Sequence, residues 1–308
     1  MPGGPWMKIG TRGSPLALAQ AREMRALLAA AHDLPEERIA LVVIKTTGDM
    51  ILDRPLSEAG GKGLFTKELD IALLDGSIDI AVHSSKDLPT LLPDGLDIAG
   101  YLPREDVRDV FISPRAESLA TLAPGSLVGT ASLRRQALVR RLRPDLRVGL
   151  LRGNVQTRLS KLASGECDAT LLALAGLKRL GMVSHATEIL AEDQFLPAVG
   201  QGAIGVTARS DDHETRIKLG SVLDAPTGFA LMLERAFLRV LDGSCRTPIA
   251  GHARIGAGRL AFRGQILRAD GSECYETLAE GAVEDAERLG VQAGNDLLAR
   301  APADILAH

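Results

Sequence analysis

Two strand-to-helix turns lie close together between residues 126 and 158, and they constrain the fold more than any other feature of this sequence. The first follows the apolar segment 126–129, where Ser132 is expected to cap a helix. The second follows the apolar segment 148–151, where Asn154 is the expected cap. Successive turns of this kind face one edge of a parallel sheet, the edge at which open α/β folds bind ligands. The pattern therefore predicts an α/β fold with a binding edge.

The same stretch concentrates arginine. Between Arg134 and Arg158 it holds eight arginines, no lysine and one acid, although the whole chain has 36 Lys+Arg and 39 Asp+Glu. Guanidinium groups match the planes of carboxylates and phosphates, and Arg134 and Arg135 fall in the first turn of a helix, beside free amides. We therefore expect a ligand with several negative groups. The alternative, a solvated basic helix face, accounts for Arg140, Arg141 and Arg143.

Length and composition set the class of protein. The 308 residues suffice for two or three domains. The first ten residues lack the apolar core of a signal peptide and no run of about 18 apolar residues occurs, so neither export nor a membrane span is expected. Three cysteines without C-x-x-C spacing fit a reducing cytoplasm, and scattered histidines predict no metal site. With 3% aromatic residues and a net charge of -3, nucleic-acid binding is disfavoured.

A third strand-to-helix turn occurs near the N-terminus. A short strand over 8–10 is followed by Arg12 and then by Ser14 and Pro15, which are strong signals for the start of a helix. Arg12 and Ser14 are therefore a third candidate contact for an anion.

A buried strand over 78–82 leads into the segment HSSKDLP, which places Lys86 and Asp87 at the end of the strand. One interpretation is a surface ion pair that contributes little. The other is a carboxylate aimed into a cationic cleft, where a permanent negative charge would stabilise a transient cation. The sequence alone favours neither.

The glycine-rich segment 60–63 precedes a helix expected over about 64–75. It is not a phosphate-binding P-loop, because Leu56 stands where the first glycine is required and Gly63 replaces the Ser/Thr after the lysine. A mobile lid and a plain flexible connection both remain open.

The C-terminal third changes character. A helix over about 227–241 precedes three consecutive strands and a final helix, which indicates a small α+β domain. Cys245 lies in the turn after the first of these helices, beside Arg246. A neighbouring cation favours the reactive thiolate, although an inert thiol is the commoner case.

Nine motifs in order then identify a known family. They are TRGSPLALAQ, TTGD, GGKGLFTKEL, AVHSSKDLPT, GTASLRRQ, LRGNVQTRL, LAGLKRLG, AVGQGA and LDGSCRTPIAGH, and they span residues 11 to about 252. In this order they closely resemble the porphobilinogen deaminase (hydroxymethylbilane synthase) family. Ser244, where glycine commonly precedes the cysteine, and Arg246-Thr247 after it are small departures in one loop.

The resemblance implies an α/β fold class, with two α/β lobes resembling a type II periplasmic-binding-protein fold plus a small C-terminal α+β domain. Domain 1 would comprise residues 1–102 and 197–220, domain 2 residues 103–196 with the arginine-rich cleft, and domain 3 residues 221–308 with the cofactor cysteine.

The resemblance also implies the reaction. A cytoplasmic, monomeric transferase of porphyrin and haem biosynthesis would join four porphobilinogens head to tail into hydroxymethylbilane and release four ammonia molecules. The cofactor would be dipyrromethane, held as a thioether on Cys245. Each pyrrole unit carries an acetate and a propionate, which fits the arginine-rich stretch.

The resemblance also implies roles for individual residues, each assigned through the motif in which the residue lies. Asp87 would stabilise cationic intermediates, hydrogen-bond pyrrole N–H groups and move protons. The cofactor or chain carboxylates would be held by Ser84, Lys86, Thr130, Ser132, Arg134, Arg135, Arg152, Asn154 and Arg158. The incoming porphobilinogen would contact Arg12, Ser14, Gln20, Arg179 and Gln201. The lid motif contains Lys62 and Phe65.

A rival hypothesis from another class is a non-catalytic cytoplasmic module that binds polycarboxylates or other anions. It explains the arginines and the two lobes, but it explains neither the third domain nor Cys245 in its loop. A nucleic-acid binder, distinguishable by steep salt dependence, is a distant third.

Overall fold

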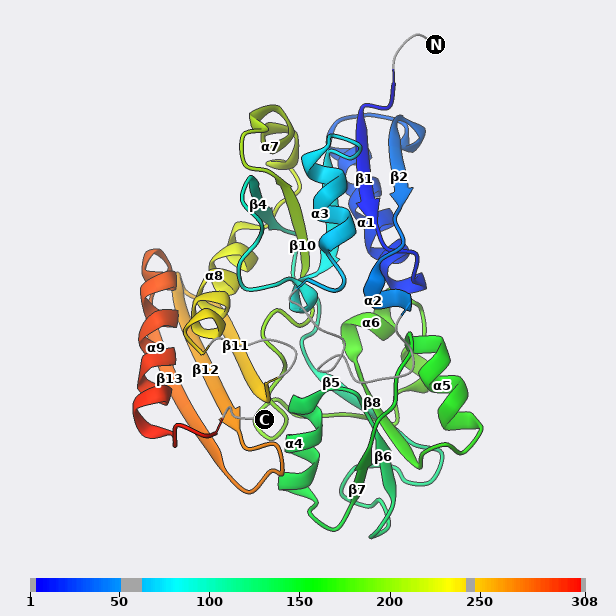
Figure 1. Ribbon diagram of the computed structural model, residues 1–308, viewed down its shortest axis with the longest axis vertical. Coiled ribbons are helices and arrows are strands. Elements are labelled where there is room, and N and C mark those ends of the chain that lie inside the picture. Colours follow the sequence, from blue (N-terminus) through cyan, green and yellow to red (C-terminus); the bar gives the residue numbers. More distant parts are fainter. Residues whose placement is uncertain (1–3, 51–62, 242–246, 306–308) are drawn as a thin grey trace. The chain divides into compact units, whose positions relative to one another are not determined.

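The computed structural model describes residues 4–50, 63–241 and 247–305, and the chain divides into two compact units. One unit comprises residues 1–105 and 203–228, and the other comprises residues 106–202 and 229–308. Figure 1 shows the elements of both units, coloured along the sequence.

The first unit is built on a five-stranded sheet with the order β2-β1-β3-β10-β4. Strand β1 is parallel to both β2 and β3, whereas β10 runs antiparallel to β3 and β4. The strands are β1 (Met7–Thr11), β2 (Ile39–Val43), β3 (Ile80–Ser84), β4 (Leu96–Tyr101) and β10 (Ile204–Arg209). The helices are α1 (Pro15–Ala31), α2 (Thr47–Met50), α3 (Lys67–Leu74) and α7 (His213–Leu219), with 3-10 turns η1 (Glu36–Arg38) and η2 (Ser85–Asp87).

Helices cover both faces of this sheet because its central strand is apolar on both sides. Ile80 and Val82 of β3 pack in a buried cluster with Leu28 of α1. Ala81, between them, packs in a second cluster with Leu69 of α3. Successive side chains of a strand point to opposite faces, so the buried run of β3 joins two layers of helix, as is typical of parallel sheets.

The second unit contains a sheet with the same kind of order, β7-β6-β8-β5-β9. Strand β6 is parallel to β7 and β8, while β5 is antiparallel to β8 and β9, so the antiparallel strand again takes the fourth place. The strands are β5 (Asp109–Ile112), β6 (Leu127–Gly129), β7 (Arg147–Gly149), β8 (Ala169–Ala173) and β9 (Glu188–Ile189). The helices are α4 (Leu133–Leu142), α5 (Val155–Ala163) and α6 (Leu174–Arg179), with a 3-10 turn η3 (Val183–His185).

The same unit also holds a three-stranded antiparallel sheet in the order β11-β12-β13. Its strands are β11 (Ile249–Gly256), β12 (Arg259–Leu267) and β13 (Cys274–Ala282), and helices α8 (Ala225–Val240) and α9 (Ala286–Arg300) flank it, with a 3-10 turn η4 (Val283–Asp285) before α9. Phe237 of α8 meets Phe262 of β12 edge to face, with ring centroids 4.9 Å apart. Thr277 of β13 donates to Asp296 of α9 at 2.7 Å. Because Phe262 and Thr277 belong to one face, both helices cover the same side of this sheet.

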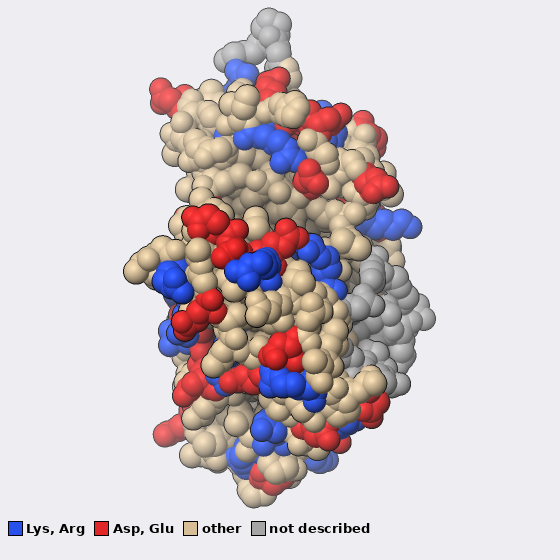
Figure 2. All heavy atoms as spheres, turned by 90° about the vertical axis from the view of Figure 1, so that its left-hand side faces the viewer, with Lys and Arg blue, Asp and Glu red and all other residues tan. Residues whose placement is uncertain are grey.

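Ion pairs connect neighbouring side chains on these two helices. Arg239 pairs with Glu287 at 2.6 Å, and Arg300 pairs with Asp296 one turn earlier in α9, also at 2.6 Å. Figure 2 shows acidic and basic side chains interspersed over the face that it displays. Exposed pairs of this kind each contribute little to stability.

The predicted fold class, two α/β lobes and a small α+β domain, is confirmed by these three sheets. Most predicted elements are present, although the helix expected over 64–75 begins only at Lys67. Strand β5 was not predicted from the sequence. The strand is only four residues long, and Val110 and Phe111 pack in different clusters, so it is buried on both faces and shows no alternation. Within the described ranges, no helix is both long and apolar enough to cross a bilayer.

Candidate functional site

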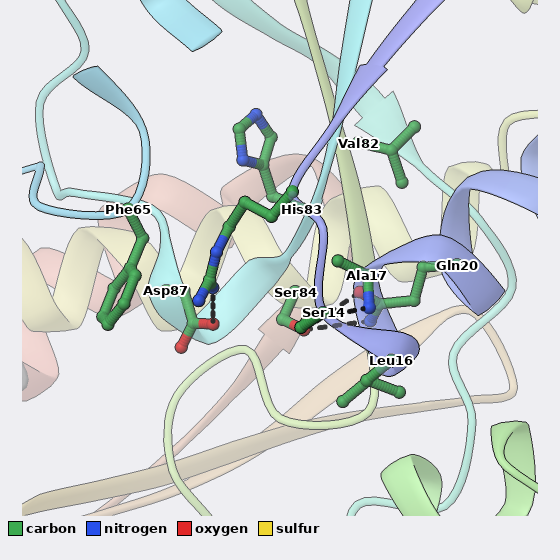
Figure 3. Close-up of a pocket in the computed structure, with 10 residues that line it drawn as sticks. Ser14, Leu16, Ala17, Gln20, Phe65, Val82, His83, Ser84 and Asp87 are labelled. Carbon is green, nitrogen blue, oxygen red and sulfur yellow. Dashed lines mark hydrogen bonds and ion pairs between the residues drawn. The ribbon is translucent and has the colours of Figure 1, made fainter. Parts of the chain in front are cut away.

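A small pocket of about 60 Å³ lies in the first unit, at the ends of β1 and β3 (Figure 3). Strands β1 and β3 are parallel neighbours, so the segments that follow them leave the sheet at the same edge. Five of the sequence-predicted site residues line this pocket together with the lid residue Phe65. The predicted five are Arg12, Ser14, Gln20, Ser84 and Asp87.

The strand-to-helix turn near the N-terminus is built as the sequence predicts. Ser14 is the N-cap of α1, and its hydroxyl accepts a hydrogen bond from the amide of Ala17 at 3.3 Å. Pro15 follows as the first helical residue, where its missing N–H costs nothing. Arg12 stands between the end of β1 and this cap, and its side chain reaches into the pocket.

Arg12 is the central cation of the pocket. Its Nη1 lies 3.7 Å from Oδ2 of Asp87, and its guanidinium carbon lies 4.2 Å from the ring centroid of Phe65. The Arg12 and Asp87 side chains keep 19% and 32% of their surface exposed. Both charges therefore remain accessible to a ligand, and a planar cation held over a ring is favourable.

Gln20 and Ser84, which also line the pocket, are hydrogen-bonded to each other. The amide nitrogen of Gln20 donates to the Ser84 hydroxyl at 2.9 Å, and that hydroxyl lies 3.2 Å from the amide oxygen. Gln20 is buried in α1 and Ser84 ends β3, so the bond ties helix to strand beside Asp87.

His83 belongs to the pocket but was not singled out by the sequence analysis. Its ring nitrogen Nε2 lies 3.0 Å from the hydroxyl of Thr207. Burial, reinforced by the charge of Arg12, lowers the pKa of His83 to about 3. The pocket therefore contains a neutral imidazole. The signal that could have found it is its place in the buried strand directly before Ser84.

The two turns of the arginine-rich stretch lie side by side in the second unit. Strands β6 and β7 are parallel neighbours, and the amide of Thr130 donates to the carbonyl of Gly149 at 2.9 Å. Ser132 caps α4 by accepting from the amide of Arg135 at 3.4 Å, and Asn154 caps α5 by accepting from the amide of Thr157 at 2.9 Å. Both predicted helix starts and their common sheet edge are confirmed.

Arg134 and Arg135 are more deeply buried than the sequence suggests. Only 4% and 5% of their surfaces are exposed, and both pair with Asp109, which is fully buried. Arg134 lies 2.8 Å and Arg135 2.7 Å from the Asp109 carboxylate. Burial lowers the pKa of Arg134. Asp109 was missed because it begins the unrecognised strand β5.

Gln201 and Arg179, predicted to contact the incoming substrate, also lie in the second unit. Gln201 is buried, and its amide nitrogen donates to the Val107 carbonyl at 2.8 Å and to Asp109 at 3.0 Å. Arg179, the last residue of α6, is half-buried and donates to the Gly202 carbonyl at 3.2 Å. Both side chains are thus held near the segment 200–202.

The remaining predicted contacts are three half-buried cations and the exposed N-cap residue Asn154. Lys86 is half-buried in η2, directly before Asp87. Arg152 and Arg158 are half-buried around the start of α5, and Arg158 donates to the Gly153 carbonyl at 2.8 Å. Lys62 and Cys245 lie outside the described residues.

Two of the three arginines assigned to a plain helix face, Arg140 and Arg143, have definite partners. Arg143 donates to the carbonyls of Leu119 and Leu122 and pairs with Asp145, while Arg140 donates to the carbonyl of Ala269. These side chains fasten loops to α4. In the part of the chain that the structure describes, no group of three His, Cys, Asp or Glu residues is arranged to hold a metal ion.

Comparison with known proteins finds two family models that together cover most of the chain. Residues 7–217 match "Porphobilinogen deaminase, dipyromethane cofactor binding domain", and residues 229–299 match "Porphobilinogen deaminase, C-terminal domain". Curated relatives named porphobilinogen deaminase include those of Nitrobacter hamburgensis and Nitrobacter winogradskyi. Each is 61% identical over 293 residues, which cover 95% of this chain and 93% of the relative.

Solved structures that show partial similarity to this chain include binding proteins. The methionine-binding protein MetQ is 15% identical, with a TM-score of 0.44 over 69% of this chain and 87% of its own. A periplasmic substrate-binding protein of an ABC transporter from Coxiella burnetii is 15% identical, with a TM-score of 0.45 over 72% of this chain and 93% of its own.

Proposed function

Because the chain belongs to the porphobilinogen deaminase family, we propose that the pocket around Asp87 and the arginine-rich edge of the second unit serve the reaction of that family. The reaction joins four porphobilinogen molecules head to tail into hydroxymethylbilane and releases four ammonia molecules. The protein is accordingly a transferase of tetrapyrrole and haem biosynthesis.

The observation that carries the site assignment is the pocket of the first unit. It places a carboxylate, Asp87, beside a half-buried guanidinium, Arg12, with the hydroxyl of Ser84 and the amide of Gln20 nearby. Porphobilinogen offers complementary groups: two carboxylates, a pyrrole N–H and an aminomethyl group. Arg12 would pair with a substrate carboxylate, and Asp87 would accept a hydrogen bond from the pyrrole N–H.

Asp87 would then act on charge that develops during the reaction. Loss of ammonia from porphobilinogen leaves a cation, and the ring that forms the new bond must lose a proton. A carboxylate beside the ring stabilises the cation and can accept that proton. General acid–base catalysis of this kind contributes roughly 10²–10⁴-fold, and electrostatic stabilisation adds to it.

The family model names a dipyrromethane cofactor, and the residues of the second unit fit such a group. Dipyrromethane carries several carboxylates, and when bound it supplies the pyrrole to which the first substrate unit is joined. The Nε of Arg134 is buried without a hydrogen-bond partner within the described part of the chain. The same sheet edge also carries the half-buried Arg152 and Arg158, and the free backbone amides at the start of α5 favour an anion.

We assign the cofactor contacts to this edge and its attachment to Cys245, as a thioether. The contacts would be Thr130, Ser132, Arg134, Arg135, Arg152, Asn154 and Arg158, with Ser84 and Lys86 from the first unit. Arg179 and Gln201 would join Arg12, Ser14 and Gln20 around the substrate, and Lys62 with Phe65 would belong to a lid. We further propose three domains with the boundaries given above, and a cytoplasmic monomer.

The test is the intact mass of the purified, acid-denatured protein before and after incubation with porphobilinogen. An added mass that matches two linked pyrrole units, absent from Cys245→Ser, would establish the cofactor and its attachment residue. Cys274→Ser is the matched control and should keep the added mass, since burial raises the pKa of the Cys274 thiol. A wild-type chain that gains no mass and forms no product would favour an anion-binding module instead.

A further inference from the structure

One buried carboxylate, Asp109, holds three of the side chains assigned to the site. Its Oδ1 accepts hydrogen bonds from Nε and Nη2 of Arg135, at 3.1 Å and 2.7 Å, and from the Gln201 amide at 3.0 Å. Its Oδ2 lies 2.8 Å from Nη2 of Arg134. All of these groups lie within the second unit, and none exposes more than 5% of its surface.

Backbone carbonyls complete the arrangement. Arg134 donates to the Leu196 carbonyl at 2.7 Å, Arg135 donates to the Leu171 carbonyl at 2.9 Å, and Gln201 donates to the Val107 carbonyl at 2.8 Å. Each of the three side chains is therefore fixed between Asp109 and one carbonyl. The carbonyls belong to three separate segments of the chain, so the carboxylate stands where these segments meet.

The charge balance shows why this carboxylate matters. Two buried guanidiniums against one carboxylate leave one net positive charge. Burial disfavours the charged form of Arg134, and the neighbouring Arg135 adds repulsion, whereas Asp109 opposes both effects. Without Asp109 the two guanidiniums would repel each other at their present positions, and the Gln201 amide would lose its charged acceptor.

We propose that Asp109 is a positioning residue for the reaction: it fixes the directions of the Arg134 and Arg135 guanidiniums and of the Gln201 amide, so that they receive the carboxylates of the pyrrole chain. This inference rests on the proposed function, because it takes these three residues as site residues. Asp109 acts through them and itself touches neither substrate nor cofactor. Residues that orient a site in this way commonly change activity by about 10–100-fold when substituted.

The first experiment compares Asp109→Asn with Asp168→Asn. Asp168 is a matched control, because it also pairs with an arginine, Arg115 at 2.7 Å, and accepts a backbone amide, that of Leu127 at 2.7 Å. It precedes β8, at the end of the sheet opposite the arginine edge. We expect both variants to unfold at lower temperature, but only Asp109→Asn to lose cofactor mass or to raise KM for porphobilinogen by about tenfold or more.

A second pair of variants covers the case in which Asp109→Asn does not fold. The double variant Asp109→Asn with Arg135→Met has the net charge of the wild-type cluster, whereas Arg135→Met alone keeps the Asp109 contacts to Arg134 and Gln201. If Asp109 fixes these side chains, kcat/KM or cofactor loading should be about tenfold lower in the double variant than in Arg135→Met. If it only balances charge, the double variant should perform at least as well.

The outcomes distinguish a failure of the proposed function from a failure of the positioning role alone. A wild-type protein that neither carries nor acquires the cofactor mass would overturn the proposed function. A loaded and active wild type, with Asp109→Asn equal to it in loading, KM and kcat, would overturn the positioning role alone. An equal loss of loading or affinity in Asp168→Asn would do the same, because it would trace the effect to reduced stability.

Discussion

Arg12 and Asp87 face each other across the pocket of the first unit, with Nη1 of the arginine 3.7 Å from Oδ2 of the aspartate. This separation is longer than a hydrogen bond, and both side chains keep part of their surface exposed. The arginine is held in addition by the ring of Phe65. The aspartate is therefore oriented by a cation without being enclosed by it, which suits a carboxylate that must accept a second positive charge during the reaction.

Asp87→Asn should leave the fold and cofactor attachment intact while removing most turnover. Asparagine preserves the shape of the side chain but carries no charge to stabilise a cation and accepts no proton. We expect kcat to fall by at least about 10²-fold, measured as product formation by protein whose cofactor mass is unchanged. Asp97→Asn is the control, since Asp97 forms an exposed pair with Arg216. Near-normal product formation by Asp87→Asn would rule out this role.

Arg12→Lys should weaken substrate binding although it conserves the charge. A lysine ammonium lacks the planar fork that matches a carboxylate and stacks less well on Phe65. Each lost contact is modest, so we expect KM for porphobilinogen to rise by roughly fivefold to tenfold. Arg25→Lys, which lies in α1 outside the pocket and pairs with Glu36, should behave as the wild type. An unchanged KM in Arg12→Lys would contradict the contact.

His83 should make the protein less stable in mild acid. Its pKa is about 3 in the folded chain against 6.5 for an unperturbed histidine, so between these values the unfolded chain binds a proton that the folded chain does not. Stability attributable to His83 is therefore present above about pH 6.5 and is lost as the pH falls toward 3. Between about pH 7.5 and about pH 5 this amounts to about 2 kcal/mol.

The measurement is the free energy of unfolding in urea at both pH values for the wild type and His83→Gln. The glutamine amide can still reach Thr207 but does not titrate in this range. The variant should lose less stability than the wild type on acidification. Equal losses in the two proteins would show that His83 does not remain neutral in the folded state.

Gly290 and Gly228 should respond in opposite directions to alanine. A Cβ at Gly290 of α9 would overlap the carbonyl oxygen of Leu233 in α8 and lie 2.8 Å from the Cβ of Ala236. The two helices would have to separate, at a cost of about 1–3 kcal/mol. Gly228 of α8 has nothing within 4 Å of such a Cβ, so alanine there should stabilise the helix by about 0.5–1 kcal/mol. Urea midpoints of the two variants test this directly, and a midpoint raised by Gly290→Ala would refute the close packing.

Local signals predicted much of the site. Ser14, Ser132 and Asn154 are each the N-cap that the sequence indicates, because capping depends on a few neighbouring residues. The repeat of strand, turn and helix then placed two arginine-bearing turns on one sheet edge, which the pairing of β6 with β7 confirms. Asp87 likewise follows a buried strand, as expected.

Long-range partners could not be predicted in the same way. Asp109 lies in a four-residue strand without alternation, and its partners Arg134, Arg135 and Gln201 are distant in sequence. Arg134 and Arg135 were expected to bind a ligand directly, because the sequence shows how many arginines there are but does not show that Asp109 is their counterion. His83 was overlooked for a related reason: its neutral state follows from burial among residues of other strands.

Most of the elements, the capped turns and the family, and hence the reaction, follow from the sequence alone, because each rests on residue types at short and fixed spacings. Only the fold shows how deeply each charged side chain is buried and which opposite charge lies beside it. Burial and pairing depend on chain segments far apart in sequence, and they set both the protonation of His83 and the fixed directions of Arg134 and Arg135 around Asp109. The chemistry could be inferred from the residues, whereas the electrostatics of the site required the fold.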